Sequence, residues 1–287
     1  MEKLLILSLS FLLASGFCSC QVKPLHLEKC NCDNKKVQDS LISIYIDNGA
    51  LKRDYNRPQW QLYCDSLINI CPNIAVAYQL KAIPFIKYGD YATAFPLEDK
   101  AVELKPEYYT AYRGFLKCIF TKDYHGAITD FEKAQQLTPN NYEMDHTYFF
   151  YEGLCNLELQ NYSRAEENFK RDIFLQTGGN TDKENTAHFN SLLYMGILYF
   201  EMKEDKKAKE YLQKSLNIYK QLPEANYYLA LVYKRENNSV LKNKYLQIAK
   251  ESILNHFGLN EDNIYYANYP HHITLYEINR ELKKQDL

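Results

Sequence analysis

Apolar residues recur every three or four positions along most of the chain, which predicts a succession of amphipathic helices. The clearest helix is expected over residues 123–139. One face of it carries both small and bulky apolar side chains, at Tyr124, Ala127, Ile128, Phe131, Ala134 and Leu137. Pro139 is expected to end this helix, because proline cannot continue one. The chain is therefore predicted to be largely α-helical.

The small residue near the start of that helix belongs to a repeated unit. Aligned on this residue, the copies lie 33, 38 and 43 residues apart, at Ala94, Ala127, Ala165 and Ala208. Four positions later an apolar residue stands in three copies, at Phe131, Phe169 and Leu212. Glu98 is the exception, in the first copy. A unit of about 34 residues that pairs two helices predicts a helical solenoid.

The repeated residues resemble the tetratricopeptide repeat family. In the first copy the matching positions are Tyr78, Ala82, Phe85, Gly89, Asp90, Tyr91, Ala94, Ala101 and Pro106. Four further copies carry the same kinds of residue, and together they cover residues 72–252. The small positions let neighbouring helices approach closely, and the bulky ones fill the space beside them. The resemblance implies an all-α, right-handed superhelical solenoid of about five helix pairs.

Flanking segments complete the predicted organisation. The chain divides into a signal peptide, a polar linker, a degenerate N-terminal helical pair, the repeat array and a C-terminal cap, at residues 1–20, 21–36, 37–71, 72–252 and 253–287. Terminal units of a solenoid meet water on one face, so departure from the pattern is expected there. The cap is expected to end in a helix that covers the last repeat.

The N-terminus has the pattern of an export signal. Lys3 precedes the apolar run Leu4 to Leu13, which is too short to span a bilayer. We therefore expect the protein to be exported. The following Ser19-Cys20 resembles the cleavage site of bacterial lipoproteins, which implies lipidation of Cys20 and a location in the cell envelope. Cleavage by the ordinary signal peptidase, giving a periplasmic or secreted protein, is the alternative.

Export favours disulfides among the next four cysteines. Cys30 and Cys32 lie in a polar stretch, and Cys64 and Cys71 lie in one predicted helix. The latter two are about 10 Å apart along the helix axis, so they cannot bond each other, but each can meet one cysteine of the first pair. Such bonds would fasten the N-terminal segment onto the first helices. A metal site built from the same four thiols is the less favoured alternative.

Charge and motifs argue against several classes of function. The net charge is −2 with a pI near 6.4 and no basic run, which disfavours nucleic acid as a partner. The sequence contains no phosphate-binding Gly-rich loop, nucleophile elbow or H-E-x-x-H motif. His271 and His272 are adjacent, so they would point in different directions on a helix and make poor joint metal ligands. No catalytic residue, cofactor or metal is predicted, and the protein is expected not to be an enzyme.

The resemblance also places candidate binding residues on the concave face of the solenoid. They are Tyr109, Tyr112, Leu116, Phe150, Leu154, Leu193, Ile197 and Phe200. These side chains suggest an apolar groove for an amphipathic helix or extended peptide, supplied by a partner or by the chain's own termini. Burial of these residues on one another is the competing interpretation.

The functional hypothesis is an envelope scaffold that binds a protein or peptide and reaches the membrane only through its lipid. The alternative is an exported small-molecule or glycan-binding protein that uses exposed tyrosines. A glycan site needs aromatic residues interleaved with hydrogen-bonding side chains, whereas a peptide groove can be mostly apolar. The apolar candidates weakly favour the peptide.

Overall fold

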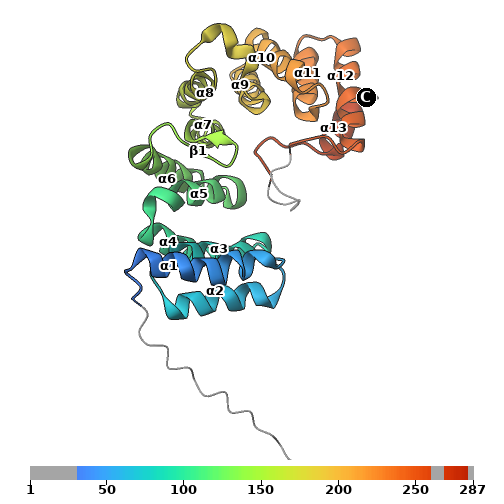
Figure 1. The fold of residues 1–287 in the computed structure, drawn as a ribbon. Coiled ribbons are helices and arrows are strands. Elements are labelled where there is room, and N and C mark those ends of the chain that lie inside the picture. Colours follow the sequence, from blue (N-terminus) through green and yellow to red (C-terminus); the bar gives the residue numbers. More distant parts are fainter. Residues whose placement is uncertain (1–30, 260–267, 284–287) are drawn as a thin grey trace, which may run out of the picture.

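The structure, a computed structural model, describes residues 31–259 and 268–283. The predicted signal peptide, Cys20 and Cys30 lie outside the described residues. The described chain is almost entirely helical and winds from the N-terminal helices at the bottom of Figure 1 to α13 at the upper right.

An irregular helical pair precedes the repeats. Helix α1 (Lys35–Ile42) continues as a π-helical turn, η1 (Ser43–Asp47), and the chain then passes through the short 3₁₀ helix η2 (Ala50–Lys52) to α2 (Pro58–Ile70). The side chain of Asn34 caps α1, and Pro58 occupies the first turn of α2, where its missing N–H is not needed.

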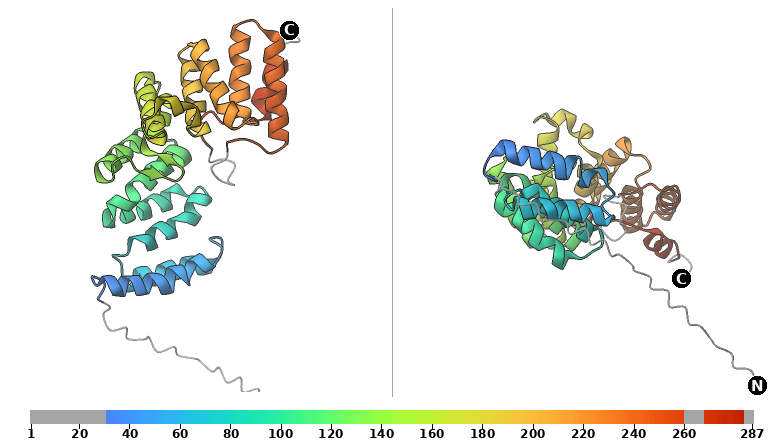
Figure 2. Two further views of the ribbon diagram at one scale, coloured as in Figure 1. Left: turned by 45° about the horizontal axis from the view of Figure 1, so that its top comes forward. Right: turned by 60° about the horizontal axis from the view of Figure 1, so that its bottom comes forward.

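Five helix pairs follow. They are α3 (Ala75–Lys87) with α4 (Tyr91–Leu104), α5 (Pro106–Leu116) with α6 (Tyr124–Leu137), α7 (Tyr148–Glu158) with α8 (Tyr162–Gln176), α9 (Phe189–Glu201) with α10 (Asp205–Ile218), and α11 (Pro223–Arg235) with α12 (Ser239–Leu254). Helix α5 continues as a π-helical turn, η3 (Lys117–Thr121). Each helix packs on its partner, and each second helix packs on the first helix of the next pair. The pairs wind into a right-handed superhelix, so the predicted fold class is confirmed (Figures 1 and 2).

The turn inside each pair is built in the same way. One residue there has a positive φ, at Gly89, Lys122, Gln160, Lys203 and Asn237. In four of the pairs the next N–H donates to a carbonyl oxygen five residues earlier, as from Asp90 to Phe85. This left-handed residue ends the first helix and satisfies its last carbonyl groups. Asp90 then caps the second helix by accepting from the N–H of Thr93.

Small residues set the distance between paired helices. A methyl group added at Gly153 would lie 2.5 Å from the Phe169 ring, and one at Gly196 would lie 2.7 Å from Leu212. Both contacts are too close for real atoms. The repeat therefore needs a small residue on the first helix opposite the bulky residue on the second.

Two insertions interrupt the array. A short antiparallel hairpin, β1 (Tyr142–Glu143) and β2 (His146–Thr147), lies between α6 and α7 and contacts α5. The 3₁₀ helix η4 (Thr181–Thr186) lies between α8 and α9.

The C-terminal segment returns to the body of the solenoid. We call residues 268–274 the C-terminal strap; it leads into α13 (Leu275–Lys283), which packs on α12. The ammonium groups of Lys234 and Lys242 bond the side chain and the carbonyl of Glu281, which fixes α13 there. In Figures 1 and 2 the strap runs from α13 along the inner side of the superhelix toward α7 and α9.

A disulfide joins Cys32 to Cys71 and so ties the segment before α1 to the end of α2. Cys64 is instead a free, fully buried thiol, whose pKa burial raises to about 12. Among the described residues, Cys64 has no cysteine partner, and Cys30, the other cysteine of the predicted pairing, lies outside them. Cys64 points into a core that includes Trp60 and Leu67, two helical turns before the residue that the N-terminal segment reaches.

Candidate functional site

The predicted concave-face residues do not form one continuous exposed groove. They lie on α5, α7 and α9, the first helices of three successive pairs. Six of them are at most 8% exposed: Leu116, Phe150, Leu154, Leu193, Ile197 and Phe200. Tyr109 and Tyr112 are only half-buried. The burial of these six agrees with the competing interpretation, in which they pack on one another, and Phe150 also packs on Tyr269 of the C-terminal strap.

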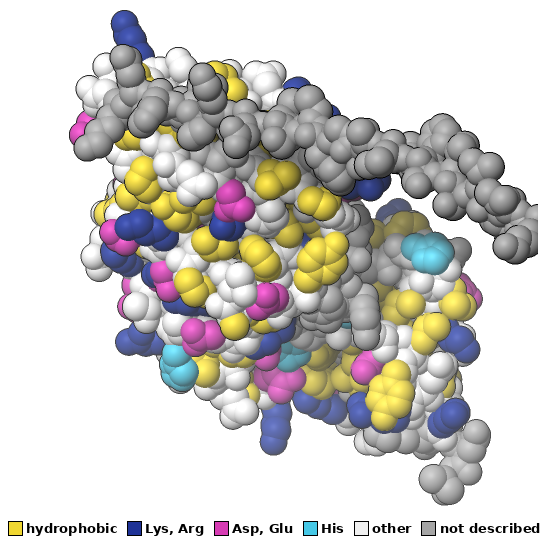
Figure 3. Space-filling view, turned by 90° about the horizontal axis from the view of Figure 1, so that it is seen from below, with side chains coloured by type: hydrophobic (Ala, Val, Ile, Leu, Met, Phe, Trp, Pro, Cys, Tyr) yellow, Lys and Arg dark blue, Asp and Glu magenta, His cyan; other side chains and the backbone are white. Residues whose placement is uncertain are grey.

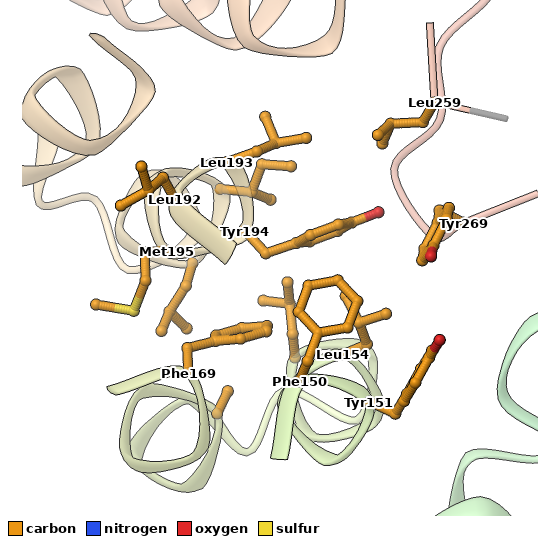
Figure 4. Close-up of a cluster of buried hydrophobic side chains, with 14 of the residues drawn as sticks. Phe150, Tyr151, Leu154, Phe169, Leu192, Leu193, Tyr194, Met195, Leu259 and Tyr269 are labelled. Carbon is orange, nitrogen blue, oxygen red and sulfur yellow. The ribbon is translucent and has the colours of Figure 1, made fainter. Parts of the chain in front are cut away.

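The strap anchors itself on the inner face through Tyr269, which is 5% exposed. Its ring centre lies 6.2 Å from that of Phe150 on α7, 6.3 Å from Tyr194 on α9, and 6.2 Å from His146 on β2. Figure 4 shows Tyr269 across from these helices, with Leu259 beside it. An aromatic pocket made by two repeats and the hairpin therefore holds one side chain of the strap.

Side chains of the repeats also bind the strap's backbone. The hydroxyl of Tyr194 donates to the carbonyl oxygen of Pro270 at 2.6 Å. The ammonium group of Lys122, at the end of the α5 unit, donates to the carbonyl oxygen of Asn268. Backbone recognition of this kind is how solenoids and grooves hold extended peptides.

The first histidine of the strap binds a carboxylate and a tyrosine. Nε2 of His271 lies 2.9 Å from a carboxylate oxygen of Glu158, and Nδ1 lies 2.6 Å from the Tyr228 hydroxyl. The Tyr124 hydroxyl donates to the other oxygen of Glu158 at 3.3 Å. Although burial opposes it, the hydrogen bond and charge of His271 hold the pKa of Glu158 below its usual value. Glu158 therefore stays ionised and attracts a cation.

The second histidine binds a deeper carboxylate. Nδ1 of His272 lies 3.1 Å from an oxygen of Glu224, and the N–H of Leu259 donates to that same oxygen at 3.3 Å. Glu224 is fully buried, and its other oxygen has no hydrogen-bond partner among the described residues. A buried carboxylate left half-satisfied is costly, so this end of the groove can accept a further donor.

The N-terminal half of the concave face differs. A cavity of about 130 Å³ opens there, lined by Ile83, Ile86, Lys87, Tyr112, Phe115, Phe120 and Met144. These residues come from α3, α5, η3 and the hairpin turn, and none belongs to the strap or α13. Met144 is 54% exposed at the hairpin turn. This half offers apolar and aromatic side chains that the strap leaves uncovered.

Two acidic side chains, Glu98 and Glu143, lie near Tyr112 of this cavity. Burial is the larger cause that raises the pKa of Tyr112, and the two carboxyl groups raise it further. Glu98 on α4 occupies the position of Phe131, Phe169 and Leu212 in the later repeats, yet it is fully buried, and neither of its carboxyl oxygens has a partner among the described residues. Burial raises its pKa well above the usual value. Burial also raises the pKa of Glu143, on the hairpin, to about 7. The N-terminal half therefore combines an apolar surface with two carboxyl groups that release their protons less readily than usual.

Sequence reasoning allowed the chain's own termini to fill the groove, but it named neither the residues of the strap nor the carboxylates that receive them. Tyr269, Glu158 and Glu224 were not among the candidates, and His271 and His272 were considered only as metal ligands. The available signal was the Tyr-Pro-His-His run itself, which combines an aromatic residue, a rigid extended backbone and two donors. Within residues 31–259 and 268–283, no three His, Cys, Asp or Glu side chains gather closely enough to hold a metal ion.

Comparison with known proteins identifies the fold. PilW, described as a widely conserved type IV pilus biogenesis factor, superposes with a TM-score of 0.60 at 14% identity, over 77% of this chain and 96% of PilW. PilF of Pseudomonas aeruginosa superposes with a TM-score of 0.57 at 19% identity, over 75% and 92%. MamA gives 0.50 at 19% identity, over 62% and 91%. No protein-family model and no curated protein matches the chain. The fold is that of the tetratricopeptide repeat proteins.

Proposed function

We propose that the protein is a non-enzymatic interaction scaffold of the bacterial cell envelope that binds an extended segment of a partner protein. The fold supports the general role, because tetratricopeptide solenoids present an inner surface to protein partners. Among the described helices, none has the length and apolarity needed to cross a bilayer. The envelope location rests on the predicted signal peptide and on Cys20, through which a lipid would tether the chain.

The observation that carries the proposal is the division of the concave face. The strap contacts α7, α9 and α11 through Tyr269, Pro270 and His271. Tyr112 on α5 is half-buried and lines the cavity of about 130 Å³, and Tyr109 on the same helix is also half-buried. We assign the partner site to this N-terminal half, at Ile83, Tyr109, Tyr112 and Met144. The cavity suits one apolar side chain, and the flat tyrosine rings suit an extended backbone.

The buried acids define the partner's chemistry further. A lysine or arginine beside the apolar side chain would lie near Glu143 and Glu98, and its charge would favour their ionised forms. We therefore propose an extended partner segment with one apolar residue next to a basic residue. The solved neighbours lend no support to the glycan-binding alternative.

Site-specific cross-linking tests this site. A benzophenone amino acid replaces Tyr112 in one variant and Tyr276, which is 69% exposed on α13, in a control variant. We expect a protein to be captured from Tyr112 and not from Tyr276, and we expect capture to be lost when Ile83→Asp is added. Mass spectrometry of the cross-link should locate an apolar-basic segment. Capture of the same proteins from both positions, or of none from Tyr112 in a folded variant, would refute the site.

A further inference from the structure

The C-terminal strap makes the contacts of a bound peptide. It touches residues from four successive repeats, through Lys122, Glu158, Tyr194 and Tyr228, although the last two lie 76 and 43 residues from their strap partners along the chain. The solenoid bonds two carbonyl oxygens of the strap, packs aromatic rings on Tyr269 and binds each imidazole to a different carboxylate. An extended ligand on a concave face would use the same three kinds of contact.

We propose that the C-terminal half of the concave face is a second peptide-binding groove, which the strap fills as an intramolecular ligand. The groove consists of Phe150, Glu158, Tyr194, Glu224 and Tyr228. Its external ligand is an extended peptide with an aromatic residue, followed two and three positions later by basic or imidazole side chains. This inference concerns the other half of the face and is independent of the proposed function.

The spacing of the ligand is read from the strap. Tyr269 fills the aromatic pocket, and His271 and His272, two and three residues later, meet Glu158 and Glu224. The carbonyl oxygen of Pro270, which lies between Tyr269 and His271 in the chain, accepts a hydrogen bond from the Tyr194 hydroxyl. A peptide that lacks the aromatic residue, or either donor, would leave a pocket empty or a carboxylate unpaired.

The groove offers a hydrogen-bond acceptor that the strap does not use. Glu224 is fully buried and keeps one oxygen without a partner among the described residues, and an imidazole is a cation only when it is protonated. The titratable side chains that face Glu158 are His271, Lys122 and Tyr124, and the Tyr124 hydroxyl donates to it. Lysine or arginine in place of the histidines would form charge-assisted hydrogen bonds at any physiological pH. A basic peptide should therefore compete successfully with the strap.

A binding experiment with defined peptides tests this. The first peptide has the strap sequence, Asn-Tyr-Pro-His-His-Ile-Thr, and the second has both histidines replaced by lysine; each carries a fluorescent label. Each peptide is titrated at pH 8 into the wild-type full chain, into Tyr269→Ala and into the control Tyr276→Ala. We expect Tyr269→Ala to bind the lysine peptide at least 10-fold more tightly than the wild type does. Tyr276→Ala should behave like the wild type.

Two further measurements complete the test. Adding Glu224→Gln to Tyr269→Ala should reduce the preference for the lysine peptide at least 3-fold, because one of the two carboxyl groups that receive the basic side chains is gone. If Tyr269→Ala does not fold, hydrogen exchange of residues 268–273 is measured in the wild type, and excess lysine peptide should speed it at least 10-fold. Failure of both peptides to bind a folded Tyr269→Ala, or unchanged exchange in the wild type, would show that the strap is a fixed part of the fold.

Discussion

The two halves of the concave face are built from the same repeat, yet only one of them is closed. Over α7, α9 and α11, aromatic side chains and two carboxylates receive the C-terminal strap, and Phe150 and Tyr194 are fully buried. Over α3 and α5, Tyr112 and Met144 line a cavity to which the strap does not contribute. The difference shows that the repeat fixes where an inner-face side chain points, while a distant segment decides whether it is accessible.

The ends of the solenoid show a related contrast. The N-terminal end is fastened covalently, through Cys32 and Cys71, whereas the C-terminal end is held by packing and hydrogen bonds. A covalent clamp keeps the N-terminal pair in place whatever binds nearby. The noncovalent strap can in principle be exchanged for another ligand. The predictions below test this contrast from its largest expected effect to its smallest.

Removing the aromatic anchor of the strap should give the largest loss of stability. Tyr269→Ala empties a buried aromatic pocket, which typically costs about 3–5 kcal/mol. Tyr112→Ala, in the uncovered half, should cost on the order of 1 kcal/mol. Urea denaturation followed by circular dichroism measures both. Equal losses for the two variants would mean that the halves do not differ in the way their burial indicates.

Opening the disulfide should act on the other end of the molecule. Cys32→Ser frees a loop whose ends are 39 residues apart, and such a loss typically costs about 2–4 kcal/mol. Hydrogen exchange should show faster opening of α1 and α2 and unchanged protection of α9 and α11, because solenoid units contact only their neighbours. Cys64→Ser removes a thiol that forms no disulfide and serves as the matched control. Faster exchange throughout the array would contradict this local role.

The repeat array was predictable from the sequence because its signal is local. Ala94, Ala127, Ala165 and Ala208 each report the distance between two adjacent helices, and that distance depends on a few nearby side chains. Exposure of Phe150 depends instead on Tyr269, about 120 positions later in the chain, which periodicity does not encode. The hairpin at residues 142–147 was missed for a different reason: its strands have only two residues each, too few to show an alternating pattern.

Replacing Glu98 gives the first repeat of the uncovered half the apolar residue that the later repeats have at this position. Glu98→Leu replaces a buried carboxyl, whose oxygens have no partner among the described residues, with the kind of residue found at Phe131, Phe169 and Leu212. Removing an unsatisfied buried polar group should stabilise the fold by about 1–3 kcal/mol at neutral pH. Thermal and urea unfolding check this. The same substitution should weaken capture of a basic partner at Tyr112. A loss of stability would show that the carboxyl has a structural partner in solution.

Glu143 provides the smallest and most specific test, because its titration belongs to the uncovered half alone. Burial raises its pKa from about 4.5 to about 7, so between these values the folded state binds more protons than the unfolded state. Stability should therefore fall as the pH rises through this window, with a slope of at most about 1.4 kcal/mol per pH unit from this group. Glu143→Gln should remove that part of the slope and leave the variant more stable than the wild type above pH 7.

Glu152 on α7, whose pKa burial also raises to about 7, is the matched control. Glu152→Gln should change the slope similarly but leave cross-linking at Tyr112 unaltered, whereas Glu143→Gln should reduce it. If both variants affect cross-linking equally, the acidic character of the N-terminal half does not select its partner.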